Sequence, residues 1–487
     1  MLVVERAVLL TMGPAGVVEG WLTVGDDGRI AEVGEDGRIA ALGEGSPPAL
    51  PPGTRRVDVG GALVAPGFVS AHSHLHTSAA RGLGTESSLY GWIEAMTTWI
   101  RRASPEDMYW ATLHGALDFL GNGITTAYDF TNGRLDFDAA SAGRGGYHGE
   151  LRPAAHVERQ LEAKLDAGIR FVHSVMLDDA AGTPEEVAGR FEEAVDHAGR
   201  HRERPELLGL AISGGVQWAR ERSTAALEVE LMQRHGVCNQ AHFLETAEQL
   251  ELQRSKFSWY EEAGAFGPRF LFGHFIHPTP DQMARAAASG SAMVWQPTSN
   301  GRLGSGVADI PRLRALGMPI GVGLDDQSCT DVSDPFQNLR IGLYTQRAAH
   351  EDPEAVAVGE MLELHTIGSA RVLGVDDRVG SLEPGKWADF LVVDPTSPDT
   401  GPMWDPVATY VLACSLRNLK QVYVAGRLVS EEGVAVSIDG DGVSAEVHER
   451  FARLSGRPSR WRRPGGSGRA SFVGGGRLAE PGVGSRP

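Results

Sequence analysis

Residues 65–76 read APGFVSAHSHLH, a short apolar run that ends in two histidines separated by one residue. In an extended strand the side chains of residues i and i+2 point to the same side, so His72 and His74 can present two imidazoles to one metal ion. Such a pair also occurs by accident on surfaces and in cores. Its meaning therefore depends on the fold around it.

The chain outward from this stretch alternates apolar runs with longer amphipathic intervals such as PEEVAGRFEEAVDHAGR at 184–200. This rhythm is typical of parallel βα units, and about eight such units close a barrel. We therefore predict an α/β fold in which residues 63–375 form a (β/α)8 TIM-like barrel. The strand candidates are ALVAPGFVSAHSH (62–74), ITTAYDF (124–130), IRFVHSVML (169–177), LLGLAIS (207–213), CNQAHFLE (238–245), RFLFGHFIH (269–277), SAMVWQPTS (291–299) and PIGVGLDD (319–326).

Both ends of the chain have a different pattern, with short strand-like runs separated by glycine turns. Residues 1–62 and 376–440 are predicted to form the two halves of one small β-sandwich domain. Residues 441–487 form a C-terminal extension rich in Arg and Gly. From about residue 465 too few large apolar side chains remain to offset the entropy of ordering, so disorder is expected there.

Polar residues follow several of the predicted strands, at the barrel end where enzymes build their sites. His242 and Glu245 end the fifth strand, His274 the sixth and Asp325 the eighth. Glu245 has an alternative role at a helix N-terminus, where the helix dipole favours carboxylates. For the neighbouring Asp326 we expect a helix-capping role.

Three imidazoles and one carboxylate suit a borderline divalent ion such as zinc and leave a position for water. The predicted ligands are His72, His74, His242 and Asp325. Such an ion lowers the pKa of a bound water toward about 7 and so supplies a nucleophile at neutral pH. His274 is predicted to bond that water or a substrate oxygen.

Composition narrows the classes of partner. The formal charge of −18 argues against nucleic acid, which needs a concentrated basic surface. Three widely spaced cysteines offer no disulfide framework, which favours a reducing cytoplasm. No apolar run reaches the length of about 18 residues that a membrane helix needs. We expect a small-molecule substrate, and a homo-oligomer is left open.

The motifs of this chain resemble those of the amidohydrolase superfamily, in its chlorohydrolase- and nucleobase-deaminase-like branch related to adenosine deaminase. The resemblance covers almost the entire chain. It rests on PGFVSAHSH (66–74), HFLET (242–246), GHFIH (273–277), PTSNGRLGSG (297–306), LDD (324–326) and VGSLEPGKWADFLVVD (379–394).

The resemblance implies the same four metal ligands and adds roles in proton transfer. Asp325 would accept a proton from the attacking water, Glu245 would shuttle protons, and His274 would stabilise the oxygen. Binuclear relatives bridge two metals with a lysine on a barrel strand, whereas Lys164, Lys256, Lys386 and Lys420 all lie outside the predicted strand ends. One ion is therefore expected, Zn²⁺ with Fe²⁺ as the alternative.

Members of this kind deaminate nitrogen heterocycles, so the implied reaction is hydrolytic deamination of a purine, pyrimidine, triazine or related ring. Hydrolysis of another C–N or C–Cl bond, as in an amidohydrolase or a chlorohydrolase, is the alternative, and a non-catalytic metal-binding barrel is a third reading. Many relatives carry a substrate-contacting histidine where this chain has Gln217 and Trp218. These two residues and Trp92 are the predicted substrate contacts.

Overall fold

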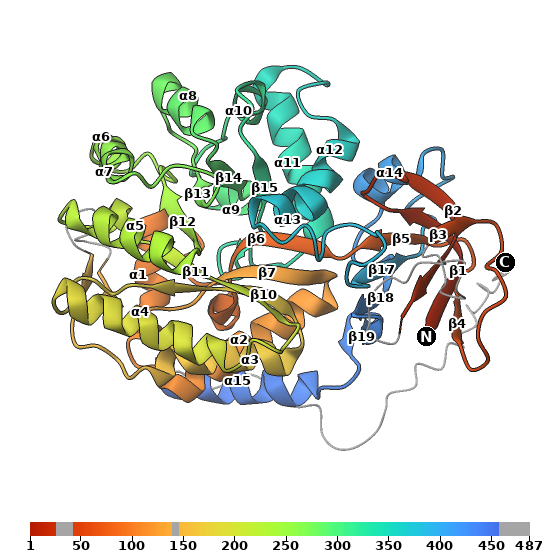
Figure 1. Ribbon diagram of the computed structural model, residues 1–487, viewed down its shortest axis with the longest axis horizontal. Coiled ribbons are helices and arrows are strands. Elements are labelled where there is room, and N and C mark those ends of the chain that lie inside the picture. The colour runs from red at the N-terminus through yellow and green to blue at the C-terminus, as the bar shows by residue number, and fades with distance from the viewer. Residues whose placement is uncertain (26–41, 139–145, 457–487) are drawn as a thin grey trace, which may run out of the picture.

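The computed structural model describes residues 1–25, 42–138 and 146–456. Its larger part is a curled parallel sheet with helices around it, and its smaller part is a sheet built from both chain ends (Figure 1). The predicted disorder from residue 465 lies outside the described residues. Among the described residues, no helix combines the length and hydropathy needed to cross a bilayer.

The parallel sheet contains a strand in each of the eight predicted segments. Its continuous path runs in the order β15-β14-β13-β12-β11-β10-β7-β6-β16, with parallel pairing throughout. The strands are β6 (Phe68–His74), β7 (Ile124–Phe130), β10 (Arg170–Met176), β11 (Leu207–Gly214), β12 (Cys238–Phe243), β13 (Phe270–His274), β14 (Ala292–Trp295), β15 (Ile320–Val322) and β16 (Asp325–Asp326). All seven residues of β7 are buried, as expected for a parallel strand covered on both faces.

The eighth strand segment brings the two ends of this sheet together. β15 pairs with β14, and β16, which follows after Gly323 and Leu324, pairs with β6. A Cβ atom at position 323 would lie 2.6 Å from the Cβ of His72, so only glycine allows this approach. The curled sheet is therefore consistent with a TIM-like barrel.

Helices follow the strands and cover the outside of the sheet (Figure 1). Several begin with a capping box and a proline in the first turn, as at Ser104, Thr183 and Thr279. The helices around the sheet are α1 (Leu89–Ile100), α2 (Pro105–Gly121), α3 (Ala155–Ala167), α4 (Pro184–Gly199), α5 (Ser223–His235), α6 (Leu250–Ser255), α7 (Phe257–Ala263), α8 (Pro280–Ala288), α9 (Pro297–Arg302), α10 (Ile310–Ala315), α11 (Pro335–His350), α12 (Val358–Glu363) and α13 (Ser369–Val372).

Shorter elements complete the connections between these strands and helices. Two of them border the site described below: η3 (Val216–Trp218), and the small antiparallel pair of β8 (Asp136–Phe137) and β9 (Tyr147–His148). The remaining short helical turns are η1 (Leu75–Ala80), η4 (Leu364–Gly368), η5 (Thr409–Ala413) and α14 (Pro406–Ala408).

The second sheet joins the two ends of the chain, on the right in Figure 1. Its strands are β1 (Leu2–Leu10), β2 (Val17–Val24), β3 (Leu42–Glu44), β4 (Arg55–Asp58), β5 (Leu63–Pro66), β17 (Phe390–Val393), β18 (Leu419–Val424), β19 (Arg427–Glu431) and β20 (Val434–Ala435). β5 pairs with β1 and β17, so residues 63–66 belong to this sheet and the predicted boundary at residue 63 was wrong. The barrel sheet begins at Phe68 because Gly67 separates the two strands.

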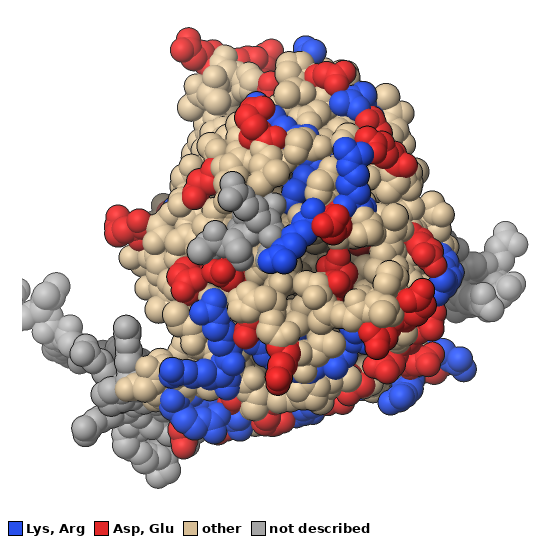
Figure 2. Space-filling model, turned by 90° about the vertical axis from the view of Figure 1, so that its left-hand side faces the viewer, with Lys and Arg blue, Asp and Glu red and all other residues tan. Residues whose placement is uncertain are grey.

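The C-terminal extension begins with a helix, α15 (Gly440–Ser455), that packs against the barrel rather than the terminal sheet. Figure 1 shows α15 at the base of the view, where it lies against α2. On the face seen in Figure 2, Lys and Arg side chains are interspersed with Asp and Glu.

Candidate active site

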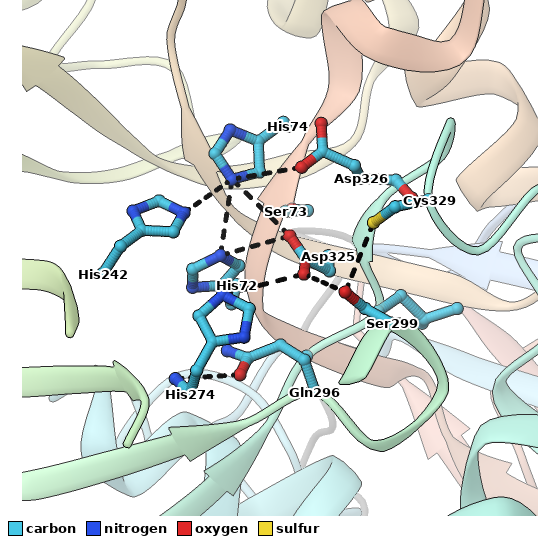
Figure 3. Close-up of polar contacts among 12 residues, drawn as sticks. His72, Ser73, His74, His242, His274, Gln296, Ser299, Asp325, Asp326 and Cys329 are labelled. Carbon is cyan, nitrogen blue, oxygen red and sulfur yellow. Dashed lines mark hydrogen bonds and ion pairs between the residues drawn. The ribbon is translucent and has the colours of Figure 1, made fainter. Parts of the chain in front are cut away.

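Three imidazoles and one carboxylate converge at the carboxyl ends of the barrel strands (Figure 3). The Nε2 atom of His74 lies 3.3 Å from Nε2 of His72 and 3.1 Å from Nε2 of His242. The Oδ1 atom of Asp325 is 3.3 Å from Nε2 of His72. Four donor atoms so close together, three of them nitrogen, match the ligand set that zinc and similar ions prefer.

Gln240 orients the first of these ligands. Its Oε1 lies 2.5 Å from Nδ1 of His72, and its Nε2 donates to the carbonyl of Ala71. Because an amide oxygen only accepts, the proton of His72 lies on Nδ1 and the Nε2 lone pair faces the metal group. The sequence did not single out this residue. Gln240 and His242 are two residues apart on one strand, however, and so point to the same side.

The backbone turns sharply where three of these strands end. Leu244, His274 and Asp325 have φ values of 56°, 66° and 68°, in a region that residues with a Cβ atom rarely adopt. The amide of His274 donates to the side chain of Gln296, which supports this conformation. Strained residues of this kind concentrate at functional sites, where the surrounding structure holds them.

A second group of side chains lies beside the metal ligands. The Nε2 atom of His274 is 3.5 Å from Oε2 of Glu245 and 3.7 Å from Oδ2 of Asp325. The side-chain amide of Asn300 donates to Nδ1 of His274 over 2.9 Å. The proton of the neutral imidazole is therefore on Nε2, where it faces the two carboxylates.

Burial sets the ionisation of this group. It lowers the pKa of His274 to about 3 and lowers the pKa of His74 and of His242 well below the usual value. Burial and the charge of Asp325 raise the pKa of Glu245 well above its usual value. Burial acts on Asp325 in the same direction, but the imidazoles around it, His72 first, hold the pKa of Asp325 well below its usual value. Burial therefore favours the neutral imidazole at His74, His242 and His274, and Glu245 retains its proton to a higher pH than a free carboxyl group does.

Ser299 and Cys329 extend this network on the side of the eighth strand. The hydroxyl of Ser299 donates to Oδ2 of Asp325 over 2.5 Å, and the thiol of Cys329 lies 3.3 Å from the Ser299 oxygen. Ser299 lies in α9, within the PTSNGRLGSG stretch that carried part of the family resemblance. Its hydrogen bond leaves Oδ1 of Asp325 facing the imidazoles.

The predicted helix-capping role of Asp326 was wrong. Its Oδ2 atom lies 3.7 Å from Nε2 of His74, and its side chain is buried against the same cavity. The chain turns after Asp326 and reaches the next helix, α11, only at Pro335. Asp334 caps that helix instead, because its side chain accepts from the amide of Gln337.

These groups open into a cavity that spans about 930 Å³ with the solvent at its mouth included. Trp92 and Trp218, two of the predicted substrate contacts, line it, and the indole ring of Trp218 lies 5.6 Å from the ring of His242. Gln217 does not line the cavity, in contrast to the prediction. Its side-chain oxygen accepts from the amide of Leu244, so it supports the backbone turn after β12.

The lysines lie away from the metal ligands. Lys164 extends from α3 to Oδ2 of Asp129, at 2.5 Å, and to Nδ1 of His173, at 2.9 Å. Lys256, between α6 and α7, donates to the carbonyls of Gln217 and Ala219. Neither side chain supplies a bridge between two metals, in keeping with the expected single ion.

Comparisons with known proteins agree with this geometry. The chain is 28% identical over 466 residues to a 5-methylthioadenosine/S-adenosylhomocysteine deaminase of Symbiobacterium thermophilum, covering 93% of this chain and 99% of that protein. It is also 28% identical over 403 residues to the deaminase of the same name from Syntrophobacter fumaroxidans, covering 81% and 86%.

Solved structures share the fold. An adenosine deaminase from Xanthomonas campestris with bound zinc superposes with a TM-score of 0.75 at 19% identity, over 93% of this chain and 98% of that chain. An atrazine chlorohydrolase from Arthrobacter aurescens in complex with zinc gives 0.75 at 20% identity, over 93% and 100%. The model of the amidohydrolase family matches residues 63–429, which include every ligand described above. The chain therefore belongs to the amidohydrolase family.

Proposed function

We propose that this protein is a metal-dependent aminohydrolase that removes an amino group from a nitrogen heterocycle such as a purine, pyrimidine or triazine. One observation carries the proposal. The four-donor group and the Glu245–His274 pair meet in a single buried cavity, so a metal ligand set and a proton carrier can act on the same bound ring.

His72, His74, His242 and Asp325 would hold one divalent ion, and the nitrogen-rich donor set favours Zn²⁺. The fit is supported by the Gln240 contact, which prepares the Nε2 atom of His72 as a donor. When bound, such an ion supplies Lewis acidity that makes a water molecule nucleophilic near neutral pH.

The side chains around this position provide the proton transfers. Asp325, ionised, would accept a proton from the attacking water. Glu245, kept protonated by burial, would donate to the ring nitrogen beside the attacked carbon, take up the second proton of the former water and pass it to the departing amine. The proton on Asp325 would then restore Glu245. The Nε2 proton of His274 would stabilise the negative charge that develops on the attacking oxygen.

We also propose the scaffold that the sequence predicted: a closed (β/α)8 barrel, with a domain of two packed β layers formed by both termini. The supporting observations are the pairing of β16 with β6 and the mixing of N- and C-terminal strands in the second sheet. With the corrected boundary, the barrel would begin at Phe68.

Ammonia release tests the proposal. Purified zinc-loaded protein is incubated with purines, pyrimidines, triazines and pterins, and with 5-methylthioadenosine and S-adenosylhomocysteine, which the relatives are named for. We expect one molecule of ammonia to be released for each molecule of product that has lost an amino group. Release of chloride, an alkylamine or a ring-opened acid in place of ammonia would contradict it.

A further inference from the structure

The cavity has two apolar walls beyond the metal ligands, and each is anchored close to the catalytic groups. On one side lie Phe137, Tyr147 and Trp218. The ring centroid of Phe137 lies 4.9 Å from that of Tyr147 and 5.6 Å from that of Trp218. The ring centroids of Trp218 and His242 are also 5.6 Å apart. The register of β8 and β9 places Phe137 opposite Tyr147. This wall is a continuous aromatic surface that leads away from the metal group.

The other wall is one face of α1, which contributes Trp92, Ile93, Met96 and Ile100 to the cavity. The indole nitrogen of Trp92 donates to the carbonyl of Ser328 over 3.2 Å, close behind Asp325 and Asp326. The helix face is thus held in place by the segment that carries the eighth-strand carboxylates. All four side chains are at least nine-tenths buried.

Two charged side chains farther along the cavity have partners. Arg101 donates to the carbonyl of Phe137 over 3.0 Å and lies 3.9 Å from Glu94. Asp136 forms an ion pair with Arg152. The residues of the two walls carry no charge, so a charged group held between them would lose its hydration without compensation, which costs binding free energy.

We propose that the substrate is a heterocycle with an uncharged, apolar arm, which lies between the α1 face and the aromatic wall of Phe137, Tyr147 and Trp218. The inference rests on the proposed function, because it takes this cavity as the substrate site. The cavity extends from the metal group along both walls to Ile100 and Phe137, so an arm on the ring would have apolar surface to pack against. The arm therefore supplies specificity that the metal group cannot provide.

Binding of matched pairs to zinc-loaded Glu245→Gln protein tests the inference, because its slow turnover leaves the compounds intact during the titration. One pair is 5-methylthioadenosine and S-adenosylhomocysteine, and the other is an aminotriazine with an N-ethyl or an N-carboxymethyl arm. Calorimetry is expected to give a dissociation constant at least about tenfold lower for the neutral member, on whichever scaffold binds. Equal or tighter binding of the charged member, or no binding of either pair at about 1 mM, would overturn the inference.

A variant of the α1 wall provides a second readout. Ile100→Ala should weaken binding of the neutral-arm compound about tenfold and leave binding of the ring without an arm unchanged. Val434→Ala, at a position 69% exposed on the terminal sheet, serves as the control. An Ile100→Ala protein that binds both compounds as the wild type does would also overturn the inference.

The proposed function is judged separately, by ammonia release from the compound that binds. A neutral arm that binds tightly without ammonia release would contradict the proposed reaction and leave the arm preference standing. Ammonia release together with preferred binding of the charged arm would contradict the arm preference and leave the proposed reaction standing.

Discussion

Gln240 shows how one residue outside the ligand set prepares a metal site. It contacts His72 through its oxygen and the Ala71 carbonyl through its nitrogen, so the backbone contact holds the amide in the position from which it orients the ring. Partners of this kind hold the tautomer and the direction of a ligand.

Replacing Gln240 by Leu should therefore lower zinc affinity by about 10- to 100-fold while the protein stays folded. Titration of the ion against a competing chelator measures the effect. Gln346→Leu is the matched control, because Gln346 is equally buried but donates to the carbonyl of Ala308, away from the site. Unchanged affinity in the Gln240 variant would remove its orienting role.

At this scale the sequence identified the residues that perform chemistry better than the residues that support them. His72, His74, His242, Glu245, His274 and Asp325 all lie at strand ends and meet at one place. Gln217 was predicted to touch substrate because it occupies a position that is histidine in many relatives, but it bonds the Leu244 amide. A helical turn as short as η3 contains too few residues for a repeating pattern, so the sequence does not reveal which way its side chains point.

Glu228 on α5 links a helix to the barrel sheet. Its carboxylate accepts from the amide of Gly215, from the side chain of Asn239 and from the hydroxyl of Tyr260. Burial nevertheless dominates and raises its pKa from 4.5 to about 7. The folded protein therefore binds this proton more tightly than the unfolded chain does.

The free energy of unfolding should fall as the pH rises from 4.5 to about 7, and the loss through this group amounts to about 3 kcal/mol. Glu228→Gln should therefore be more stable relative to the wild type at about pH 8 than at about pH 5. Urea unfolding at the two pH values measures the difference. Glu230→Gln, on the exposed side of the same helix, should show no such dependence.

Helix α15 supports the wall of the cavity from outside. The ring of Phe451 lies 4.7 Å from the ring of Trp99 on α1, and Arg450 and Arg453 both bond Asp107 at the start of α2. Other side chains of α1, including those of Ile93 and Met96, line the cavity. Displacement of α15 would therefore loosen the α1 wall without touching the metal ligands.

Phe451→Ala should raise KM several-fold and change kcat little, because an aromatic contact of this kind contributes about 0.5–1.5 kcal/mol. Steady-state kinetics on the compound identified by the ammonia screen measures the split. Glu449→Ala, at an exposed position of the same helix, is the control. A fall in kcat at unchanged KM would show that α15 acts on the chemistry instead.

The eight barrel strands could be predicted because each is an apolar run, and parallel strands buried on both faces need such runs. The boundary at residue 63 could not, since LVAP and FVSA are equally apolar and only pairing assigns them to different sheets. The contact of α15 with α1 joins residues far apart in the chain, so no local sequence pattern predicts it.

In the whole molecule, one buried ion pair joins the barrel to the terminal sheet. Arg170 at the start of β10 donates through two nitrogens to Asp389, at 2.5 and 3.0 Å. Asp389 also accepts from the amide of Ala425, and its carbonyl accepts from the amide of Gly67 between β5 and β6. The junction between the two sheets therefore centres on one carboxylate residue.

Removal of one partner leaves a buried charge uncompensated, so Asp389→Ala should lower the free energy of unfolding by about 3–5 kcal/mol. Asp58→Ala breaks a pair of similar geometry with Arg6, whose side chains are 48% and 68% exposed, and should cost far less because solvent screens the two charges. Urea denaturation of the two variants checks the contrast. Equal losses would mean that the junction is not held by this pair.

The proposed deamination depends above all on a single metal ion that acts together with Glu245. Metal-free protein, prepared with a chelator, is titrated with zinc while ammonia release is followed. Turnover should be absent without the ion and should reach a plateau at one ion per chain. Glu245→Gln should bind that ion equally well and turn over at least about 100-fold more slowly. Full turnover in the metal-free protein, or in Glu245→Gln, would contradict the account.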